Sequence, residues 1–303
     1  MYKTVRRHDE TQSHADRQRV GRPKLSTVRD DRVLVRLSLQ NRRETIPALR
    51  ASWGEHGVLS SDSTVKRRLQ EAGLHGRRAV KKPLLTPVHR AKRLAFAQEH
   101  ANWTWIDWST VLWTDESRFT LFQNDGNVFV RRRVNEQLRP DCIVPTVKFG
   151  GGGVTVWGAM SYRGTGFLTP LTGNLNARGY IQILEDSMVP SAHLLGYGNH
   201  YFFMDDGAPC HRAGIVSTWK DENNVRCLQN WPPQSPDLNP IENLWKELKT
   251  SVRRFRSRNL RELAANLETA WANIPVVKCQ RLIRSMPDRI QAVIAARGGY
   301  TRY

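Results

Sequence analysis

The first third of the chain carries apolar residues at helical spacing. Three short helices are predicted there, over residues 29–39, 43–53 and 61–72. Their apolar faces consist of Val33, Leu34 and Leu37, of Ile46, Leu49 and Trp53, and of Val65, Leu69 and Ala72. Ser60 or Ser61 can cap the third helix, and Gly73 ends it. The pattern predicts a small three-helix domain.

The rest of the chain mixes short apolar runs with amphipathic stretches. The predicted strands are residues 111–114, 118–122, 127–131, 154–157, 201–204 and 225–228, with a turn at 124–126. One helix is predicted to start near Pro240, which suits a first turn, and two more cover 259–274 and 278–297. The cluster of Trp103, Trp105, Trp108 and Trp113 is interpreted as packing rather than as a base-stacking surface.

Acidic residues stand at the ends of two predicted strands and at the start of a helix. Asp115 follows the first strand of the body, Asp205 and Asp206 follow strand 201–204, and Glu242 lies just inside its helix. Such positions can bring three carboxylates to one edge of a sheet, where they repel one another unless cations neutralise them. Hard oxygen ligands suit Mg²⁺ or Mn²⁺, and two such ions can promote phosphodiester cleavage. From spacing alone, a surface turn stays the alternative interpretation of each acid.

The net charge of the chain and its distribution bear most directly on the kind of partner. The 303 residues include 47 Lys and Arg against 28 Asp and Glu, a net charge of +19. Residues 1–100 hold 23 basic and 10 acidic residues, and the other 203 hold 24 and 18. A basic front module therefore precedes a more balanced body. Such a charge favours a polyanionic partner, nucleic acid first and an anionic membrane surface second.

Several classes of protein are disfavoured by the sequence. No stretch approaches the roughly 20 apolar residues of a membrane span, so we expect no membrane partner. The charged N-terminus has no apolar region of the kind that directs secretion. The four cysteines lie far apart and form no CxxC pair, which argues against a disulfide scaffold or a cysteine zinc site and fits a reducing compartment.

The third predicted helix presents hydroxyl and basic side chains, as the last helix of a helix-turn-helix does when it enters the major groove. Its candidate DNA contacts are Ser63, Thr64, Lys66, Arg67 and Arg68. Before it, Arg22 and Lys24 form an extended clip on a Gly/Pro backbone, which suits the A·T minor groove. After it comes a basic run that can track phosphates or act as a nuclear import signal, made of Arg77, Arg78, Lys81 and Lys82. A helical bundle and a linker with merely solvated charges are the alternative.

Several segments together resemble the Tc/mariner-like superfamily of cut-and-paste DDE/D transposases, the Tc branch in particular. They are GRPKLS at 21–26, KKPLL at 81–85, WTDESRF at 113–119, VWG at 156–158, DGAPCH at 206–211, SPDLNPIENLW at 235–245 and RGGYTRY at 297–303. The block at 235–245 is long enough to be highly specific. The resemblance extends from about residue 20 to the end.

The resemblance implies an α/β, ribonuclease-H-like catalytic domain, a mixed sheet flanked by helices, after a small all-α helix-turn-helix domain. It places the catalytic and metal-binding acids at Asp115, Asp206 and Glu242, with two Mg²⁺ or Mn²⁺ ions per site. Asp205 is the main rival of Asp206, and Gly207 stands where the family commonly has Asn. His211 has two interpretations: it orients a phosphate or a metal-bound water, or it starts a helix without a catalytic role.

The implied domains are a basic tail with the clip (1–24), a helix-turn-helix domain (25–80), a linker with a helix (81–108) and the catalytic domain (109–303). Family members normally carry two helix-turn-helix subdomains. Only 20 residues precede Gly21 here, so we expect an N-terminally shortened transposase.

The implied function is cut-and-paste transposition in the nucleus. The chain would bind terminal inverted repeats and target DNA as double strands and associate with itself in a paired-end complex. It would cleave DNA strands and join 3′-hydroxyls to target DNA. The alternative is a catalytically silent DNA-binding remnant of a decayed transposable element, which would bind DNA in a salt-dependent way without cleaving it.

Overall fold

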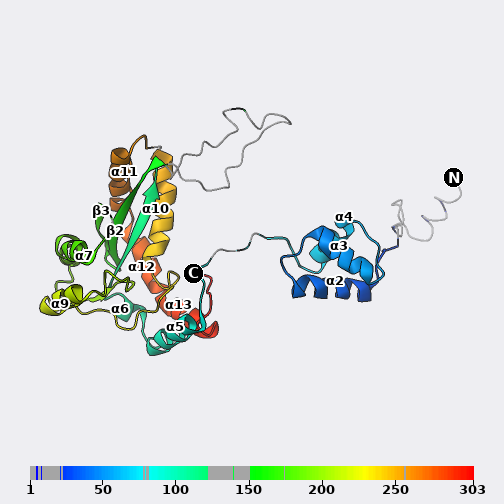
Figure 1. The fold of residues 1–303 in the computed structure, drawn as a ribbon, viewed down its shortest axis with the longest axis horizontal. Coiled ribbons are helices and arrows are strands. Elements are labelled where there is room, and N and C mark those ends of the chain that lie inside the picture. The colour runs from blue at the N-terminus through cyan, green and yellow to red at the C-terminus, as the bar shows by residue number, and fades with distance from the viewer. Residues whose placement is uncertain are drawn as a thin grey trace. The chain divides into compact units, whose positions relative to one another are not determined.

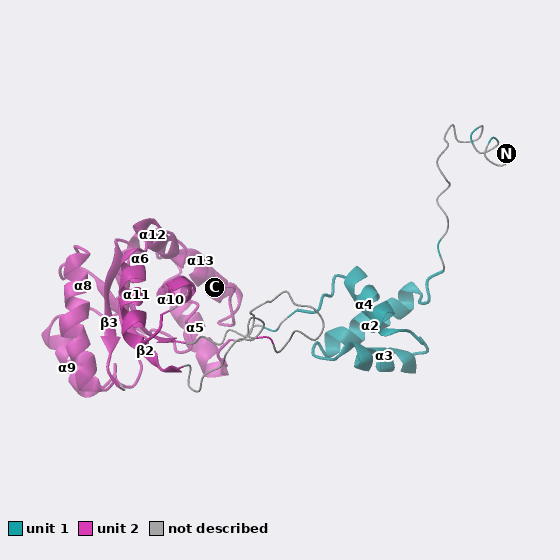
Figure 2. Cartoon of the chain, turned by 90° about the horizontal axis from the view of Figure 1, so that it is seen from above, with its two compact units in different colours: residues 1–81 teal, residues 82–303 magenta. Residues whose placement is uncertain are grey.

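The computed structural model describes residues 23–77, 82–121, 151–173, 175–255 and 257–303, together with Val5, His8, Gly21, Ala79 and Arg139. It divides into two compact units, residues 1–81 and 82–303 (Figure 2). Several sequence predictions lie outside the described residues: the DNA contacts Arg22, Arg78 and Lys81, the turn at 124–126 and the strand at 127–131.

The first unit contains the three predicted helices, α2 (Val28–Gln40), α3 (Ile46–Glu55) and α4 (Asp62–Glu71). Each begins after a hydroxyl side chain that accepts a hydrogen bond from a backbone N–H of the first turn; these caps are Thr27, Thr45 and Ser61. The local sequence thus fixes where each helix starts.

A small apolar core holds these helices together. It is made of Leu34, Leu49, Trp53, Val58, Val65 and Leu69, all buried. The indole Nε1 of Trp53 donates a hydrogen bond to the Asp30 carbonyl, 3.0 Å away, so the one polar group of this large side chain is satisfied. The apolar faces predicted from periodicity form this core, with Val33, Leu37 and Ile46 partly buried against it, but the predicted Ala72 is exposed at the end of α4.

Across the described residues, a four-stranded mixed sheet forms the centre of the second unit. Its strands are β1 (Val111–Thr120), β2 (Gly153–Ser161), β3 (Gly164–Leu171) and β4 (Phe202–Met204), in the spatial order β3-β2-β1-β4. β2 pairs antiparallel with β1 and β3, and β4 pairs parallel with β1. The predicted mixed sheet is confirmed.

β1 differs from the prediction in its length. The predicted strands 111–114 and 118–122 are parts of one strand, because pairing with β2 continues without a break from Trp113 to Thr120. Asp115 therefore lies within β1 rather than after it. The predicted strand 225–228 is reduced to a single bridge, between Phe203 and Cys227.

Helices cover both faces of the sheet, and Figure 1 shows α10 running alongside the strands. One core joins the sheet to α5 (Pro87–Glu99), α6 (Trp105–Trp108), α10 (Ile241–Phe255), α11 (Leu260–Ala272), α12 (Val276–Arg284) and α13 (Met286–Ala295). The other core joins it to α7 (Ala177–Ile183), a π-helical turn η3 (Leu184–Met188), α8 (Val189–Leu194) and α9 (Gly214–Glu222). Each strand therefore contributes side chains to two cores.

The predicted C-terminal helix 278–297 is two helices in the structure, α12 and α13. Pro287 stands in the first turn of α13, and a proline has no N–H to continue a preceding helix. Within the described residues, no helix combines the length and the apolar character that a membrane crossing needs.

Candidate active site and DNA-binding surface

Asp115 and Asp206 both follow the paired stretch of β1 and β4. The two strands are parallel, with Trp113 opposite Met204. Asp115 comes two residues after Trp113 and still lies within β1, whereas Asp206 comes two residues after Met204 and lies in the loop that follows β4. The pairing register thus places the first two predicted acids beyond the same end of the β1–β4 pairing.

The neighbouring Asp205 is engaged elsewhere. Its Oδ2 forms an ion pair with Nζ of Lys220 from α9, and its side chain is 17% exposed. The Tyr180 hydroxyl lies 3.4 Å from the same oxygen. The Asp206 side chain is 48% exposed. An internal cation already neutralises Asp205, so Asp206 is the better candidate for a ligand.

Glu242 reaches β1 from the first turn of α10. The Asn239 side chain anchors this helix start, because its Nδ2 donates to the Thr114 carbonyl at 3.2 Å and its Oδ1 accepts from the Ile241 N–H at 3.3 Å. Trp245, three residues after Glu242, donates from Nε1 to Asp115 Oδ2 at 3.0 Å. Positions three apart share a helix face, so Glu242 lies on the face that meets Asp115.

The electrostatics of the site show that the acids crowd one another. Burial, with the charges of Glu242 and Glu116 added, raises the pKa of Asp115 to about 8. Burial also raises the pKa of Glu242, and the nearby Lys249 opposes this rise only in part. Two carboxylates that resist ionisation in this way form a site whose charged state a bound cation would stabilise.

The donor chemistry fits a hard divalent cation, because the three acids offer only carboxylate oxygens. They do not form a closed cage: among the described residues, no three His, Cys, Asp or Glu side chains lie close enough together to hold one ion. The crowding of Asp115 by Glu242 is the observation that favours metal binding here. Asp206 instead contacts His211.

His211 is a buried residue in contact with the acids. Its Nδ1 lies 2.9 Å from Asp206 Oδ1 and its Nε2 lies 3.5 Å from Glu116 Oε1, although neither contact has the alignment of a good hydrogen bond. Burial alone would lower the pKa of His211, but these two carboxylates outweigh it and raise that pKa to about 10. The contact with His211 in turn lowers the pKa of Asp206.

Sequence reasoning missed Arg93, which is 1% exposed in α5. Its two terminal nitrogens each donate to one oxygen of Asp237, both at 2.7 Å. The same guanidinium donates to Ser235 Oγ and to the carbonyls of Gly298 and Gly299. A detectable signal existed, since Arg93 lies on the helix face of the buried Phe96 and Ala97.

The sequence block at 235–245 and the chain end are thus joined physically. Arg289 of α13 donates to the Asp237 carbonyl at 2.8 Å and to Asn243 Oδ1 at 2.6 Å. Thr301 donates from its hydroxyl to Asp237 Oδ2 at 2.6 Å. These contacts hold the loop from which α10 and Glu242 start.

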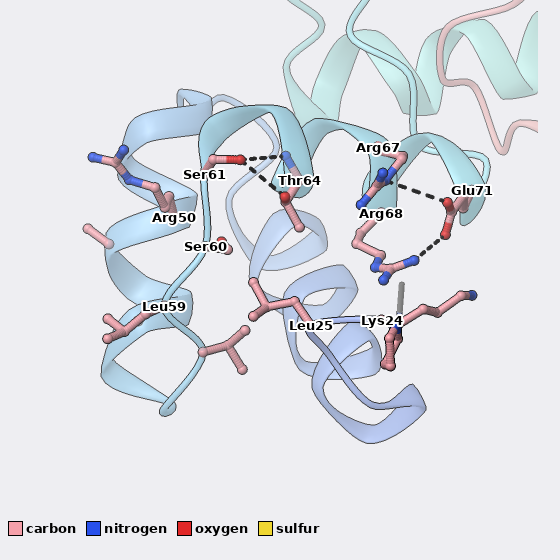
Figure 3. Close-up of a pocket in the computed structure, with 14 residues that line it drawn as sticks. Lys24, Leu25, Arg50, Leu59, Ser60, Ser61, Thr64, Arg67, Arg68 and Glu71 are labelled. Carbon is pink, nitrogen blue, oxygen red and sulfur yellow. Dashed lines mark hydrogen bonds and ion pairs between the residues drawn. The ribbon is translucent and has the colours of Figure 1, made fainter. Parts of the chain in front are cut away.

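The first unit presents part of the predicted DNA-binding set. Ser63, Lys66 and Arg67 are exposed on α4, and Lys24 and Arg77 are exposed beside it. Thr64 is half-buried, and its backbone N–H and hydroxyl both contact Ser61 Oγ in the helix cap (Figure 3). Lys82 is exposed in the second unit, where its Nζ donates to the Tyr303 main-chain oxygen at 2.7 Å.

Arg68 departs from the expectation of a DNA contact. It is 4% exposed, and Figure 3 shows its side chain directed towards Glu71 rather than outward. Its guanidinium pairs with Glu71 at 2.8 Å and with Asp31 at 3.5 Å, and donates to Ser26 Oγ at 3.0 Å. These partners hold the buried Arg68 inside the domain, where it joins α4 to the start of α2.

A cavity of about 1350 Å³ opens between the clip, α3 and α4 (Figure 3). Its lining includes Lys24, Arg50, Ser60 and Arg67. Basic and hydroxyl groups on a concave surface next to the exposed face of α4 are suited to phosphate contacts.

The fold and the acids define the class of protein: a DNA-cleaving enzyme of the DDE type with a helix-turn-helix module. Residues 31–102 match a family described as "Transposase", and residues 110–264 match the "DDE superfamily endonuclease" family. The chain belongs to the Tc1/mariner family of DDE transposases and lies in its Tc branch. It is a Tc1-family cut-and-paste transposase.

The relatives support this membership over most of the chain. The Tcb1 transposase of Caenorhabditis briggsae is 40% identical over 90% of this chain and 100% of its own length. The Tc1 transposase of Caenorhabditis elegans is 43% identical over 80% of this chain and 88% of its own.

A solved structure titled "Mos1 transposase paired-end complex with left transposon end" shares the fold, with a TM-score of 0.77, 18% identity, and coverage of 100% of this chain and 89% of that one. The predicted ribonuclease-H-like fold is therefore confirmed. Other Mos1 paired-end structures are titled as complexes with Mg and with Mn.

Proposed function

We propose that Asp115, Asp206 and Glu242 are the catalytic, metal-binding acids of this transposase, with two Mg²⁺ or Mn²⁺ ions per site. The observation that carries this proposal is the proximity of Glu242 to Asp115, because the charge of Glu242 adds to burial in raising the pKa of Asp115. The β1–β4 register adds Asp206 to the same end of the sheet. Bound divalent ions would supply activation of the attacking hydroxyl and neutralisation of the leaving oxygen.

The residues around these acids would prepare the site for DNA. Trp245 holds one Asp115 oxygen through its 3.0 Å hydrogen bond and so fixes the carboxylate's orientation. Asn239 ties the start of α10 to β1, which keeps Glu242 over the strand. Asp205, already paired with Lys220, takes no part in metal binding.

We further propose that residues 25–80 bind the terminal inverted repeats, with residues 1–24 as a basic arm, 81–108 as linker and 109–303 as the catalytic domain. The proposed contacts are Ser63, Thr64, Lys66 and Arg67 on α4, with Lys24, Arg22, Arg77, Arg78, Lys81 and Lys82 in the flanking segments. The exposed cations and the cavity beside α4 support this surface.

The chain would act in a paired-end complex of two copies on DNA, in the nucleus, and would join the cut ends to target DNA. The Mos1 structures that share its fold are titled as paired-end and strand-transfer complexes, which supports this arrangement. The basic run at 77–82 would serve import as well as phosphate contact.

The test is strand cleavage of a labelled duplex that carries the inverted repeat of the encoding element, with Mg²⁺ or Mn²⁺. We expect Glu242→Gln to lower the cleavage rate by at least about 10³-fold, because it removes an anionic ligand from the proposed metal site. Glu247→Gln, on the same helix and paired with Lys278, is the matched control and should cleave normally.

Undiminished cleavage by Glu242→Gln would remove that residue from the site. Salt-dependent binding without any cleavage by the unmodified chain would instead favour the silent remnant.

A further inference from the structure

His211 has a fixed position between the acids of two strands. It is 4% exposed, and its ring stacks on Tyr180 with centroids 3.9 Å apart and planes 23° apart. Tyr180 is itself fully buried, and Lys220 lies over its ring with Nζ 5.8 Å from the centroid. Packing on this stack leaves the imidazole little freedom to move.

The contacts on Asp206 all fall on one oxygen. Oδ1 accepts from the Ala208 N–H at 2.9 Å and faces His211 Nδ1 at 2.9 Å. Within the described part of the chain, these are the contacts found for this carboxylate besides the charge of Arg212. Because both contacts fall on Oδ1, Oδ2 is the oxygen that is available to a bound cation.

The other ring nitrogen faces the second strand. Nε2 lies 3.5 Å from Glu116, the residue that follows Asp115 on β1. His211 therefore links the loop after β4 to β1 at the level of the proposed metal ligands.

We propose that His211 is a positioning residue, which holds Oδ1 of Asp206 and presents Oδ2 to the divalent cation. This inference rests on the proposed role of Asp206 as a ligand. The sequence leaves two interpretations of His211 open, an orienting role and a helix start without a catalytic role. The inference favours the orienting role, exerted through Asp206. Groups that orient a metal ligand typically change metal affinity 10- to 100-fold when they are removed.

The experiment measures Mn²⁺ binding to the full chain by electron paramagnetic resonance, with thermal unfolding as a second measurement. His211→Leu keeps the bulk and removes both nitrogens, so we expect Mn²⁺ affinity to fall about 10-fold or more. His211→Asn places an amide nitrogen near the position of Nδ1 and should recover most of that loss. His211→Gln places its amide near Nε2, towards Glu116, and should recover less.

His100 provides the matched control. It is also 4% exposed and packed against aromatic rings, with centroid distances of 4.2 Å to Phe96 (tilted) and 4.5 Å to Trp103 (edge-on), and its Nδ1 lies 2.9 Å from the Phe96 carbonyl. His100→Leu should lower the melting temperature and leave Mn²⁺ affinity unchanged. A purely structural His211 would behave in the same way.

Three results would decide the matter. Wild-type Mn²⁺ affinity in His211→Leu, or equal affinities of His211→Asn and His211→Gln, would overturn the positioning role. The Asn and Gln comparison applies even if His211→Leu fails to fold. Unchanged Mn²⁺ affinity in Asp206→Asn would overturn the proposed metal site itself, and with it this inference.

Discussion

Gly158 shows at the scale of one residue how a missing side chain shapes the site. It lies on β2 opposite Asp115 in the antiparallel pairing. A Cβ at this position would lie 2.6 Å from the ring edge of Trp245. The absence of a side chain thus lets Trp245 pack across the sheet and reach Asp115 with its indole nitrogen.

We expect Gly158→Ala to destabilise the second unit by about 1–3 kcal/mol, because overpacking must displace the Trp245 ring or the strand. The measurement is urea unfolding followed by tryptophan fluorescence. Gly214→Ala is the control: no atom lies within 4 Å of its added Cβ, so its unfolding midpoint should not fall. Equal midpoints for Gly158→Ala and the unmodified chain would contradict this packing account.

At the scale of elements, three segments distant in the sequence meet at Arg93. The helix α5, the loop before α10 and the segment after α13 converge on one buried guanidinium. Gly298 allows the close approach of the last of these, because it has a φ of +74° and a Cβ there would overlap the Arg90 carbonyl. The start of α10, and so the position of Glu242, depends on contacts that no single element contains.

We expect Arg93→Met to cost about 3–5 kcal/mol in the free energy of unfolding, because it leaves the Asp237 carboxylate buried and unpaired. Asp237→Asn should also destabilise. The double variant should lose less than the sum of the two single changes, since neither partner then remains as an uncompensated charge. Urea unfolding at neutral pH measures all four proteins, and additive losses would contradict a direct pairing.

The same pair gives a pH dependence with a definite sign. Burial would raise the pKa of Asp237, but hydrogen bonds from Arg93 and Thr301 outweigh it and hold that pKa below its usual 3.8. The stabilisation is therefore complete above about pH 4 and is lost as the pH falls through the lowered value. Arg93→Met should weaken this acid dependence.

At the scale of the whole molecule, the two units carry different kinds of charge, which suit DNA binding and cation binding respectively. Exposed cations of the first unit lie on and beside α4, and also on α2, in the loop between α2 and α3 and on α3, while the second unit has carboxylates at one end of its sheet. A basic surface attracts the DNA backbone, and an acidic site needs cations before it can accept a phosphate.

We expect each exposed phosphate contact to contribute to the salt dependence of DNA binding. Lys66→Ala and Arg67→Ala should each reduce the slope of log K against log salt by about 0.9, because each removes one neutralised phosphate. Fluorescence anisotropy of a labelled inverted-repeat duplex, over a series of salt concentrations, measures the slope. Arg68→Met is the control on the same helix: it should lower the melting temperature and leave the slope unchanged, because Arg68 is buried.

The helices of the first unit were predictable from local signals. Hydroxyl caps and apolar spacing determine where α2, α3 and α4 lie, because both act within a few residues. The length of β1 was not predictable in this way, since its continuation past Asp115 depends on pairing with β2 more than 30 residues away in the chain. Pro287 marks the break between α12 and α13 in the sequence. The amphipathic pattern continues across it, so the pattern alone predicted one helix.

The sequence by itself determined which acids are available and in what order, and its resemblance to the transposase motifs pointed to Asp115, Asp206 and Glu242. Only the tertiary structure decided how each polar side chain is used. Asp205 forms an ion pair with Lys220, and Arg93 forms one with Asp237. Arg68 pairs with Glu71 and Asp31 inside the first unit. The physical reason is that a buried charge must find its partner in space. Periodicity gives the direction of a side chain from its own element, and most of these partners come from other elements.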